Sequence, residues 1–425
     1  MNGAENPDVT VAAATRVWAR IGLLSFGGPA AQIGLMHKEI VESRGWLSEK
    51  QFLNATGFCM LLPGPEAMQI ATYAGWRLHG VFGGLIAGSL FVLPGALVIL
   101  LLAALYLSFG AVPAVNAIFV GVQAAVISIV IGALLGLSKR ALKGAMAWML
   151  AVFGFLALFA MNLPFPLVIL CAAALGAVSA RSERETFTEP VSLKSNLAFT
   201  IVIWLCIWGA PLALLWLFDP GGILLQIGLF FSKLAVVTFG GAYAVLAYMS
   251  QQVVTDFGWL SAAQMMDGLG LAETTPGPLI LVTEFVGFVA GFGAGSWGLG
   301  LAAAVLTLWV TFVPCFLWIF AAAPYVEWIA AQPRLKGALD GITAAVVGVI
   351  ANLSLWFALH VLFGEVRQVD VSWASPWVPE LTSMDVVAIA LTAVSLAMYF
   401  IAKRPLLQVL SICAALALGI NLAGL

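Results

Sequence analysis

Long apolar runs separated by short polar segments dominate the chain. A helix needs about 20 apolar residues to cross a bilayer, and only helices and closed barrels satisfy every backbone polar group in lipid. The pattern therefore predicts an all-α integral membrane protein. The expected spanning helices are 82–107, 113–138, 142–161, 164–180, 197–218, 299–323, 338–363, 384–402 and 405–423.

Four further apolar stretches are interrupted by glycine and proline. A helix that stops inside lipid exposes backbone groups, so such a break is tolerated where it lines a buried or wet cavity. The alternative is a simple kink in a spanning helix, which membrane proteins also tolerate. The stretches are 11–44, 48–78, 222–252 and 261–292, and their breaks are Phe26-Gly27-Gly28, Pro63-Gly64-Pro65, Phe239-Gly240-Gly241 and Pro276-Gly277-Pro278.

The chain contains an internal duplication with a constant offset of 213 residues. Phe26 returns as Phe239 and Trp46 returns as Trp259, each together with the two residues that follow it. A constant offset over such a stretch indicates a repeated structural unit. We predict three parts: a first repeat over 1–180, a polar linker with one connecting helix over 181–221, and a second repeat over 222–425.

Each repeat also carries the same signal for a helix start. Ser48 with Gln51, and Ser261 with Gln264, fit a capping box in which the glutamine side chain returns to the serine backbone. We therefore expect a helix to begin directly after each Trp-Leu-Ser.

Positive charge alternates between equivalent loops of the two repeats. Loop 36–50 carries three basic residues and its partner 249–263 carries none, whereas loop 106–116 carries none and its partner 326–337 carries two. Because Lys and Arg concentrate on the cytoplasmic side, the opposite signs predict inverted-topology repeats with a cytoplasmic N-terminus. Together with the breaks, they predict nine full crossings and four re-entrant helical hairpins.

The composition excludes several classes of protein. Hydrophobic residues make up 62% of the chain and charged residues 9%, whereas a soluble domain carries roughly a quarter charged residues. The net charge of −2 and the lack of a basic arm argue against nucleic acid as a partner. The N-terminus shows no signal-peptide pattern. No P-loop, zinc motif or nucleophile pattern is present, so we expect no enzyme, no metal and no cofactor.

The breaks predict an anion-binding site near the bilayer midplane. The helix N-termini that follow them present free N–H donors and the positive end of the helix dipole, and glycine allows a close approach. The alternative is that small residues only permit tight helix packing. The predicted binding residues at the breaks are Phe26, Gly27, Gly28, Pro63, Gly64, Pro65, Phe239, Gly240, Gly241, Pro276, Gly277 and Pro278.

Two cations complete the predicted anion site. Arg20 and Lys233 occupy the same repeat position, seven residues before the first glycine of a break. We expect both to face the anion, because charges within membrane segments are usually functional. The alternatives are a cytoplasmic anchor for Arg20 and a side chain that snorkels to the interface for Lys233.

Three acids are candidates for proton coupling: Glu66, Glu273 and Glu284. Glu66 lies in the first turn of a helix, where the helix dipole alone favours a carboxylate. Glu273 lies at the end of a helix, so we expect it to be protonated or paired with a cation. Glu284 lies in the middle of an apolar segment, where it could pair with Lys233.

The motifs resemble those of one known family. Phe-Gly-Gly-Pro at 26–29, Trp-Leu-Ser at 46–48 and Leu-Pro-Gly-Pro-Glu-Ala at 62–67 resemble the first-domain pattern of the chromate ion transporter family, and the breaks after residues 238 and 275 resemble its second. The resemblance covers nearly the whole chain and matches the long, two-domain form. It implies export of chromate, a tetrahedral dianion, across the bacterial inner membrane, which gives chromate resistance.

The expected partners are therefore a chromate or sulfate-like dianion and membrane lipid, while a homodimer is left open. A dianion that leaves a cell with a negative interior gains about 4.6 kcal/mol per 100 mV, so export needs little coupling. Proton exchange, which would make the protein an antiporter, is an added hypothesis. The alternatives are a sulfate or other oxyanion transporter and a non-transporting membrane scaffold.

Overall fold

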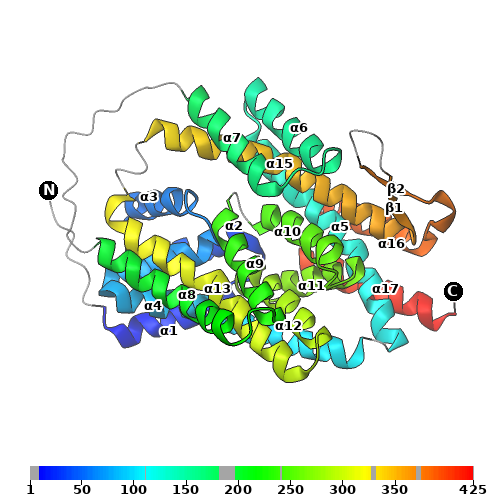
Figure 1. Ribbon diagram of the computed structural model, residues 1–425, viewed down its shortest axis with the longest axis horizontal. Coiled ribbons are helices and arrows are strands. Elements are labelled where there is room, and N and C mark those ends of the chain that lie inside the picture. Colours follow the sequence, from blue (N-terminus) through cyan, green and yellow to red (C-terminus); the bar gives the residue numbers. More distant parts are fainter. Residues whose placement is uncertain are drawn as a thin grey trace. The chain divides into compact units, whose positions relative to one another are not determined.

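A computed structural model describes residues 9–110, 112–180, 197–239, 242–326, 332–369 and 375–424. Helices form almost all of the described chain, as the apolar runs predicted (Figure 1). The elements are α1 Val11–Leu24, α2 Gly28–Met36, η1 His37–Glu42, α3 Glu49–Cys59, α4 Glu66–Phe109, α5 Pro113–Ala141, α6 Ala145–Phe159, α7 Phe165–Ser179, α8 Leu197–Phe218, α9 Ile223–Val237, α10 Ala242–Gln251, η2 Gln252–Asp256, α11 Ala262–Thr274, η3 Leu279–Leu281, α12 Val282–Gly293, α13 Trp297–Ala322, η4 Ala323–Tyr325, α15 Pro333–Leu362, β1 Val366–Gln368, β2 Trp377–Pro379, η5 Leu381–Ser383, α16 Val386–Leu396, η6 Ala397–Ile401 and α17 Leu406–Leu422.

The duplication seen in the sequence returns as repeated local structure. Both repeats continue a short helix into a π-helix, η1 in the first and η2 in the second. The Trp46 N–H then donates 2.8 Å to the Ile40 carbonyl, and the Trp259 N–H donates 2.8 Å to the Val253 carbonyl. The same backbone path is thus built twice.

The predicted capping boxes are both formed. The backbone N–H of Ser48 donates to Gln51 Oε1 at 2.9 Å, and that of Ser261 donates to Gln264 Oε1 at 2.9 Å. The reverse bonds to the serine hydroxyls measure 3.3 and 3.1 Å. Helices α3 and α11 therefore begin where the sequence indicated.

Three of the four predicted breaks lie fully within the described residues, and these are interruptions rather than kinks, whereas Gly240 and Gly241 of the fourth lie outside the described residues. Helices end at Leu24, Cys59, Val237 and Thr274, and the next helices begin several residues later. Positive φ angles of 86° at Gly27, 78° at Gly28, 116° at Gly64 and 88° at Gly277 turn the chain at the breaks. The element α4 is itself two helices, because His79 and Gly80 have non-helical backbone angles. The chain reverses there, and Gly75 before the turn lies against Gly83 after it.

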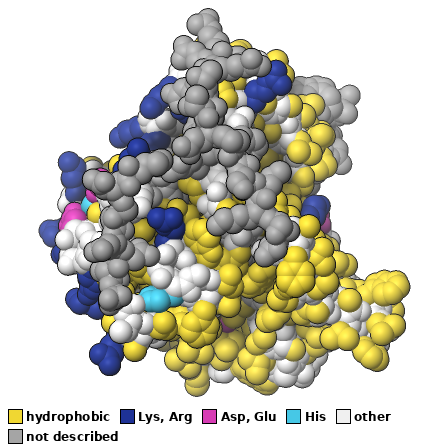
Figure 2. Space-filling model, turned by 90° about the vertical axis from the view of Figure 1, so that its left-hand side faces the viewer, with side chains coloured by type: hydrophobic (Ala, Val, Ile, Leu, Met, Phe, Trp, Pro, Cys, Tyr) yellow, Lys and Arg dark blue, Asp and Glu magenta, His cyan; other side chains and the backbone are white. Residues whose placement is uncertain are grey.

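The chain is a multi-pass membrane protein by the length and composition of its helices. Five helices within the described residues are long and apolar enough to cross a bilayer: α4, α5, α8, α13 and α15. The other predicted crossings correspond to shorter apolar helices, such as α6 and α7 with 15 residues each, so the count of nine stays a prediction. Figure 2 shows hydrophobic side chains over much of one face, with Lys and Arg gathered along part of it.

Contacts between Cα atoms divide the chain into two compact units, and each unit combines segments from both halves of the sequence. Unit 1 comprises Met1–Leu101, Arg181–Ala242 and Thr275–Lys336, and unit 2 comprises Leu102–Ala180, Tyr243–Thr274 and Gly337–Leu425. In unit 1, α13 packs against α8, α9 and α12.

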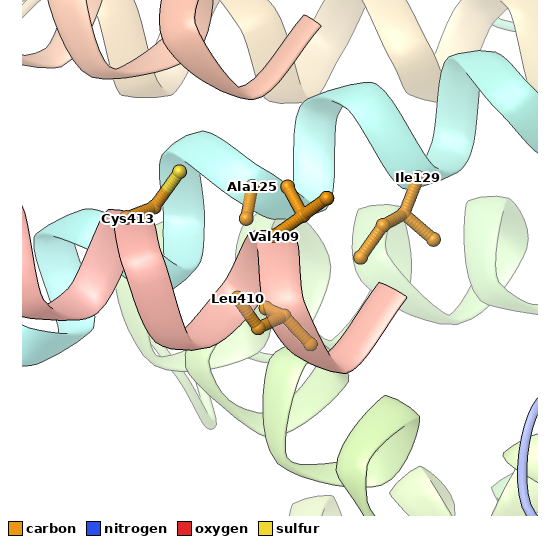
Figure 3. Packing of buried hydrophobic residues seen from close by; sticks show 5 residues of the cluster. All are labelled: Ala125, Ile129, Val409, Leu410 and Cys413. Carbon is orange, nitrogen blue, oxygen red and sulfur yellow. The ribbon is translucent and has the colours of Figure 1, made fainter. Parts of the chain in front are cut away.

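Small residues allow the helices to approach closely in both units. A Cβ atom on Gly291 of α12 would lie 2.6 Å from that of Ala303 on α13, and one on Gly287 would meet the Thr307 hydroxyl. In unit 2, α5 packs against α17 through a cluster of buried residues: Ala125, Ile129, Val409, Leu410 and Cys413 (Figure 3). Packing of this kind is typical of helices in lipid, where small residues let backbones come together.

Candidate functional site

The two repeats exchange a pair of backbone hydrogen bonds at their breaks in unit 1. The N–H of Gly64 donates to the carbonyl of Thr238 at 2.9 Å, and the N–H of Gly277 donates to the carbonyl of Ser25 at 2.8 Å. Gly64 and Gly277 are equivalent in the duplication, and so are Ser25 and Thr238. Each Pro-Gly-Pro is thereby tied to the helix end that precedes the Phe-Gly-Gly of the other repeat.

Two buried glutamines hold the carbonyl groups that the breaks leave without helical partners. Gln32 Nε2 donates to the Gly277 carbonyl at 2.7 Å and to the Ser25 carbonyl at 3.3 Å. Gln69 Nε2 donates to the Pro63 carbonyl at 2.7 Å. Because unpaired backbone groups are costly away from water, these amides stabilise the interruptions.

A small pocket lies where these breaks meet. Its volume is about 20 Å³, which suits one water molecule. Equivalent segments of the two repeats line it, because Pro65, Glu66 and Ala67 match Pro278, Leu279 and Ile280 in the duplication. The other lining residues are Pro29, Gln32 and Gly64.

Helix starts from both repeats border this pocket. Helix α4 begins at Glu66, and its first helical hydrogen bond runs from the Gln69 N–H to the Pro65 carbonyl. The short helix η3 begins at Leu279, and the Leu281 N–H donates to the Pro278 carbonyl. The first amides of a helix have no carbonyl partner within it, so both starts suit an anion.

Glu66 gives the pocket its one asymmetric charge among the residues that line it. Its counterpart Leu279 is apolar and also lines the pocket. The Glu66 carboxylate lies at the positive end of α4, where the helix dipole favours it.

The two predicted cations lie outside the pocket lining. Arg20 is exposed on α1, with Nη2 4.0 Å from Glu39 Oε1. Lys233 is exposed on α9. In the described chain, therefore, neither cation is among the residues that line the pocket.

The remaining residues of the Phe-Gly-Gly breaks are spread between surface and interior. Phe26 is 41% exposed and Gly27 is also exposed, whereas Gly28 and Phe239 are half-buried. Gly240 and Gly241 lie outside the described residues. The three residues of Pro276-Gly277-Pro278 are buried, and Pro63 is half-buried.

Charged side chains form a group of ion pairs in the segment that follows α2. The buried Glu39 accepts hydrogen bonds from Arg44, which ties η1 to the loop after it. His37 Nε2 lies 2.7 Å from Glu49 Oε2, and Nδ1 lies 3.3 Å from Glu42 Oε1. The hydrogen bond to Glu49 raises the pKa of His37 above its ordinary value, with further support from the charge of Glu42.

The other two candidate acids have contrasting surroundings. In unit 2, the buried Glu273 accepts a hydrogen bond of 2.5 Å from the Tyr243 hydroxyl. In unit 1, Glu284 is 1% exposed, and its Oε2 has no hydrogen-bond partner in the described part of the chain. No ion pair between Lys233 and Glu284 is formed among the described residues, so the pairing considered from the sequence is not present.

Sequence reasoning gave no role to several polar residues that the structure buries. Gln32 links two breaks, whereas Gln69 bonds to Pro63 within its own break. For Gln32 the available signal was an amide within an apolar stretch. In unit 2, Asp267 accepts hydrogen bonds from the Tyr106 hydroxyl at 2.9 Å and from Gln123 Nε2 at 2.7 Å. Such partners come from distant segments, which spacing along the chain does not show.

Comparison with known proteins agrees with the duplicated architecture. The family model described as "Chromate transporter" matches residues 12–177 and again residues 225–420. The two matches begin 213 residues apart, the same offset as that of the repeated motifs. No solved structure matches the chain.

Several named proteins are similar to nearly the full length of the chain. The chromate transport protein of Cupriavidus metallidurans is 30% identical, over 83% of this chain and 86% of its own. That of Pseudomonas aeruginosa is 32% identical, over 79% and 78%. The probable chromate transport protein of Synechococcus elongatus is 30% identical, over 82% and 84%. With the family model matched in both repeats and such relatives along the chain, the protein belongs to the chromate transporter family.

Proposed function

We propose that the protein transports chromate across the membrane and binds the dianion at the pocket between the two Pro-Gly-Pro breaks. The observation that carries the proposal is that equivalent segments of both repeats line one pocket, with helix starts on two sides. Family membership and the names of the similar proteins support chromate as the substrate.

Backbone amides supply the chemistry of this binding site. A tetrahedral oxyanion carries acceptors on every side, so N–H donors from several helix starts suit it better than one charged side chain does. The present pocket has room for only about one water molecule, so the breaks must move apart before an oxyanion enters. Gly64, which lines the pocket, lets the backbone itself come close to a ligand.

Arg20 and Lys233 complete the proposal as charges at the approaches to the pocket. They occupy equivalent positions on α1 and α9, seven residues before the first glycine of each break. Their exposure suits attraction of an anion from a distance rather than direct binding. Phe26 and Phe239 would flank the breaks as apolar walls.

The charge of the dianion supports one direction of transport. We propose export across the bacterial inner membrane from a cytoplasmic N-terminal side, by inverted repeats with re-entrant hairpins. A dianion gains about 4.6 kcal/mol per 100 mV on leaving a negative interior, so the membrane potential alone would drive efflux. Chromate resistance would follow from this export.

Proton exchange would add coupling and make the protein an antiporter. Glu66 borders the pocket, and Glu273 is buried against Tyr243, so either carboxyl could change protonation during the cycle. Replacing Glu273 with Gln should flatten the dependence of chromate transport on pH. A transport profile that keeps its pH dependence in this variant would remove Glu273 from the mechanism.

A second candidate function is transport of sulfate or a similar oxyanion on the same scaffold. Backbone amides bind the oxygen atoms of an oxyanion and do not distinguish chromium from sulfur at its centre. The residues that line the pocket offer no group that would select chromate over sulfate. A non-transporting membrane scaffold is the alternative from another class, and it predicts no oxyanion flux. We also propose that the protein contacts membrane lipid, and a homodimer is left open.

The test is flux in proteoliposomes with an imposed potential. Chromate and sulfate movement would be compared for the unchanged protein, Arg20→Ala and Lys233→Ala. The proposal expects chromate flux in the unchanged protein and slower flux in both variants. Equal flux in all three proteins would remove the two cations from the site, and a lack of any oxyanion flux would favour the scaffold.

A further inference from the structure

One buried carboxyl group in unit 1 lies on a helix packed against two others that carry buried hydroxyls without partners in the described chain. Glu284 lies on α12, is 1% exposed, and has no hydrogen-bond partner for Oε2 among the described residues. The facing helix α13 carries Thr307 and Thr311, whose buried hydroxyls also have no partner there. Helix α9 packs against both α12 and α13. The buried hydroxyl of its Ser232 also has no hydrogen-bond partner among the described residues.

The register between α12 and α13 places these groups near one another. Gly291 packs against Ala303, and one turn away Gly287 packs against Thr307. The helices therefore run antiparallel, and the next turn brings residues 283–284 beside Thr311. Glu284 thus lies next to a line of hydroxyls rather than next to a charged partner.

No opposite charge compensates this carboxyl within the described packing. Helix α13 contains no Asp, Glu, Lys, Arg or His, and its one titratable group is the buried thiol of Cys315. On α9 the charged residue is Lys233, which is exposed, and η3 has none. Helix α4 approaches the break around Gly95, where it carries no charged side chain.

An ionised carboxylate is energetically unfavourable when it is buried without an opposite charge. A charge buried without a partner costs several kcal/mol, and groups in this position take up a proton instead. Hydroxyls can solvate a neutral carboxyl as donors or acceptors, but they bring no positive charge. The packed arrangement of α12 is therefore compatible with the neutral acid and opposes the carboxylate.

We propose that Glu284 is an intramembrane proton-binding site whose protonation keeps α12 packed against α13. Loss of the proton favours a conformation in which water reaches α12. Because Leu279 and Ile280 of η3 line the oxyanion pocket and lead directly into α12, this movement would open one wall of that pocket. This link to the pocket rests on the proposed function, whereas the proton site itself does not.

The proton site can be tested without any substrate. Hydrogen exchange of the α12 amides would be followed against pH in the purified protein, corrected for the intrinsic pH dependence of exchange. For one linked proton, opening of α12 should rise by up to about tenfold per pH unit once the group titrates. Glu284→Gln should abolish this dependence and keep α12 protected, while Glu284→Asp should retain it.

A control variant and a transport assay complete the design. Glu380→Gln removes an exposed carboxylate from a different unit, so it should leave the exchange profile of α12 unchanged. In proteoliposomes, chromate-dependent proton movement should be present in the unchanged protein and lost in Glu284→Gln. Equal α12 exchange slopes in the unchanged protein and Glu284→Gln would overturn the proton site. Lack of chromate flux with an intact slope would instead count against the proposed function.

Discussion

The backbone N–H of Gly64 lies 2.9 Å from the carbonyl oxygen of Thr238, and this bond has an equivalent between Gly277 and Ser25 at 2.8 Å. Each repeat therefore completes the interrupted helix of the other. The reciprocal arrangement gives each Pro-Gly-Pro the same backbone contact, although the Ser25 carbonyl also accepts a hydrogen bond from Gln32. The pocket of the proposed transport site lies beside these bonds.

Replacing Gly64 with Ala should destabilise the protein and slow transport. The residue has a φ of 116°, and a Cβ there would lie 2.8 Å from Cys315 Sγ and 2.9 Å from Gln69 Nε2. Backbone strain of this kind costs about 1–3 kcal/mol. Thermal unfolding in detergent and chromate flux would both be measured. Gly209→Ala on α8, where a Cβ meets nothing within 4 Å, is the matched control and should keep or raise stability.

Replacing Gln32 with Leu should loosen the second Pro-Gly-Pro. The variant leaves the carbonyls of Gly277 and Ser25 without their side-chain donor in a buried place, at a cost of about 1–3 kcal/mol. Gln226→Leu removes a similar amide-to-carbonyl bond at an exposed position and should change stability far less. Unfolding temperatures that fall equally in both variants would contradict the special role of Gln32.

Replacing Glu66 with Gln should strengthen oxyanion binding. The change keeps the size of the side chain but removes the negative charge from the pocket lining, so a dianion would no longer be repelled. A gain of about tenfold in affinity corresponds to 1.4 kcal/mol. Glu66→Leu, which copies the residue at the equivalent position 279, should act in the same direction. Chromate binding by equilibrium dialysis would measure both, and weaker binding in Glu66→Gln would argue against the proposed pocket.

The contacts of His37 predict a local dependence of stability on pH. Because the folded pKa is raised above 6.5, its ion pairs with Glu49 and Glu42 contribute fully below that pH and are lost as pH rises through the raised value. The contribution should be under about 1 kcal/mol, since the pairs are near the surface. Unfolding temperatures of the unchanged protein and His37→Gln should therefore differ at pH 5.5 and converge at pH 8.5. A constant difference across this range would show that the charge of His37 is not involved.

The helices and their breaks could be read from the sequence, because apolar length, capping boxes and Gly-Pro clusters are local signals. The start of α3 after Ser48 and that of α11 after Ser261 are examples. The polar contacts of the site were not predictable in this way. Gln32 reaches Gly277 and Tyr106 reaches Asp267 across the fold, and periodicity does not report such distant partners.

The positions of charged side chains were the least accessible to sequence reasoning. Arg20 lies near Glu39 because α1 and η1 approach each other, a relationship that spacing from the break did not indicate. Lys233 is exposed on α9, and its expected role toward an anion stays a prediction. Equivalence in the duplication fixed their position along the helix but not the direction of their long, flexible side chains.

Binding of an oxyanion where the two Pro-Gly-Pro breaks meet can be seen directly in an anomalous difference map at the chromium edge, from crystals of the protein with chromate. We expect a chromium peak within about 4 Å of the backbone nitrogens that open α4 and η3, near Ala67 and Ile280. A peak at another place, with none between the breaks, would contradict it.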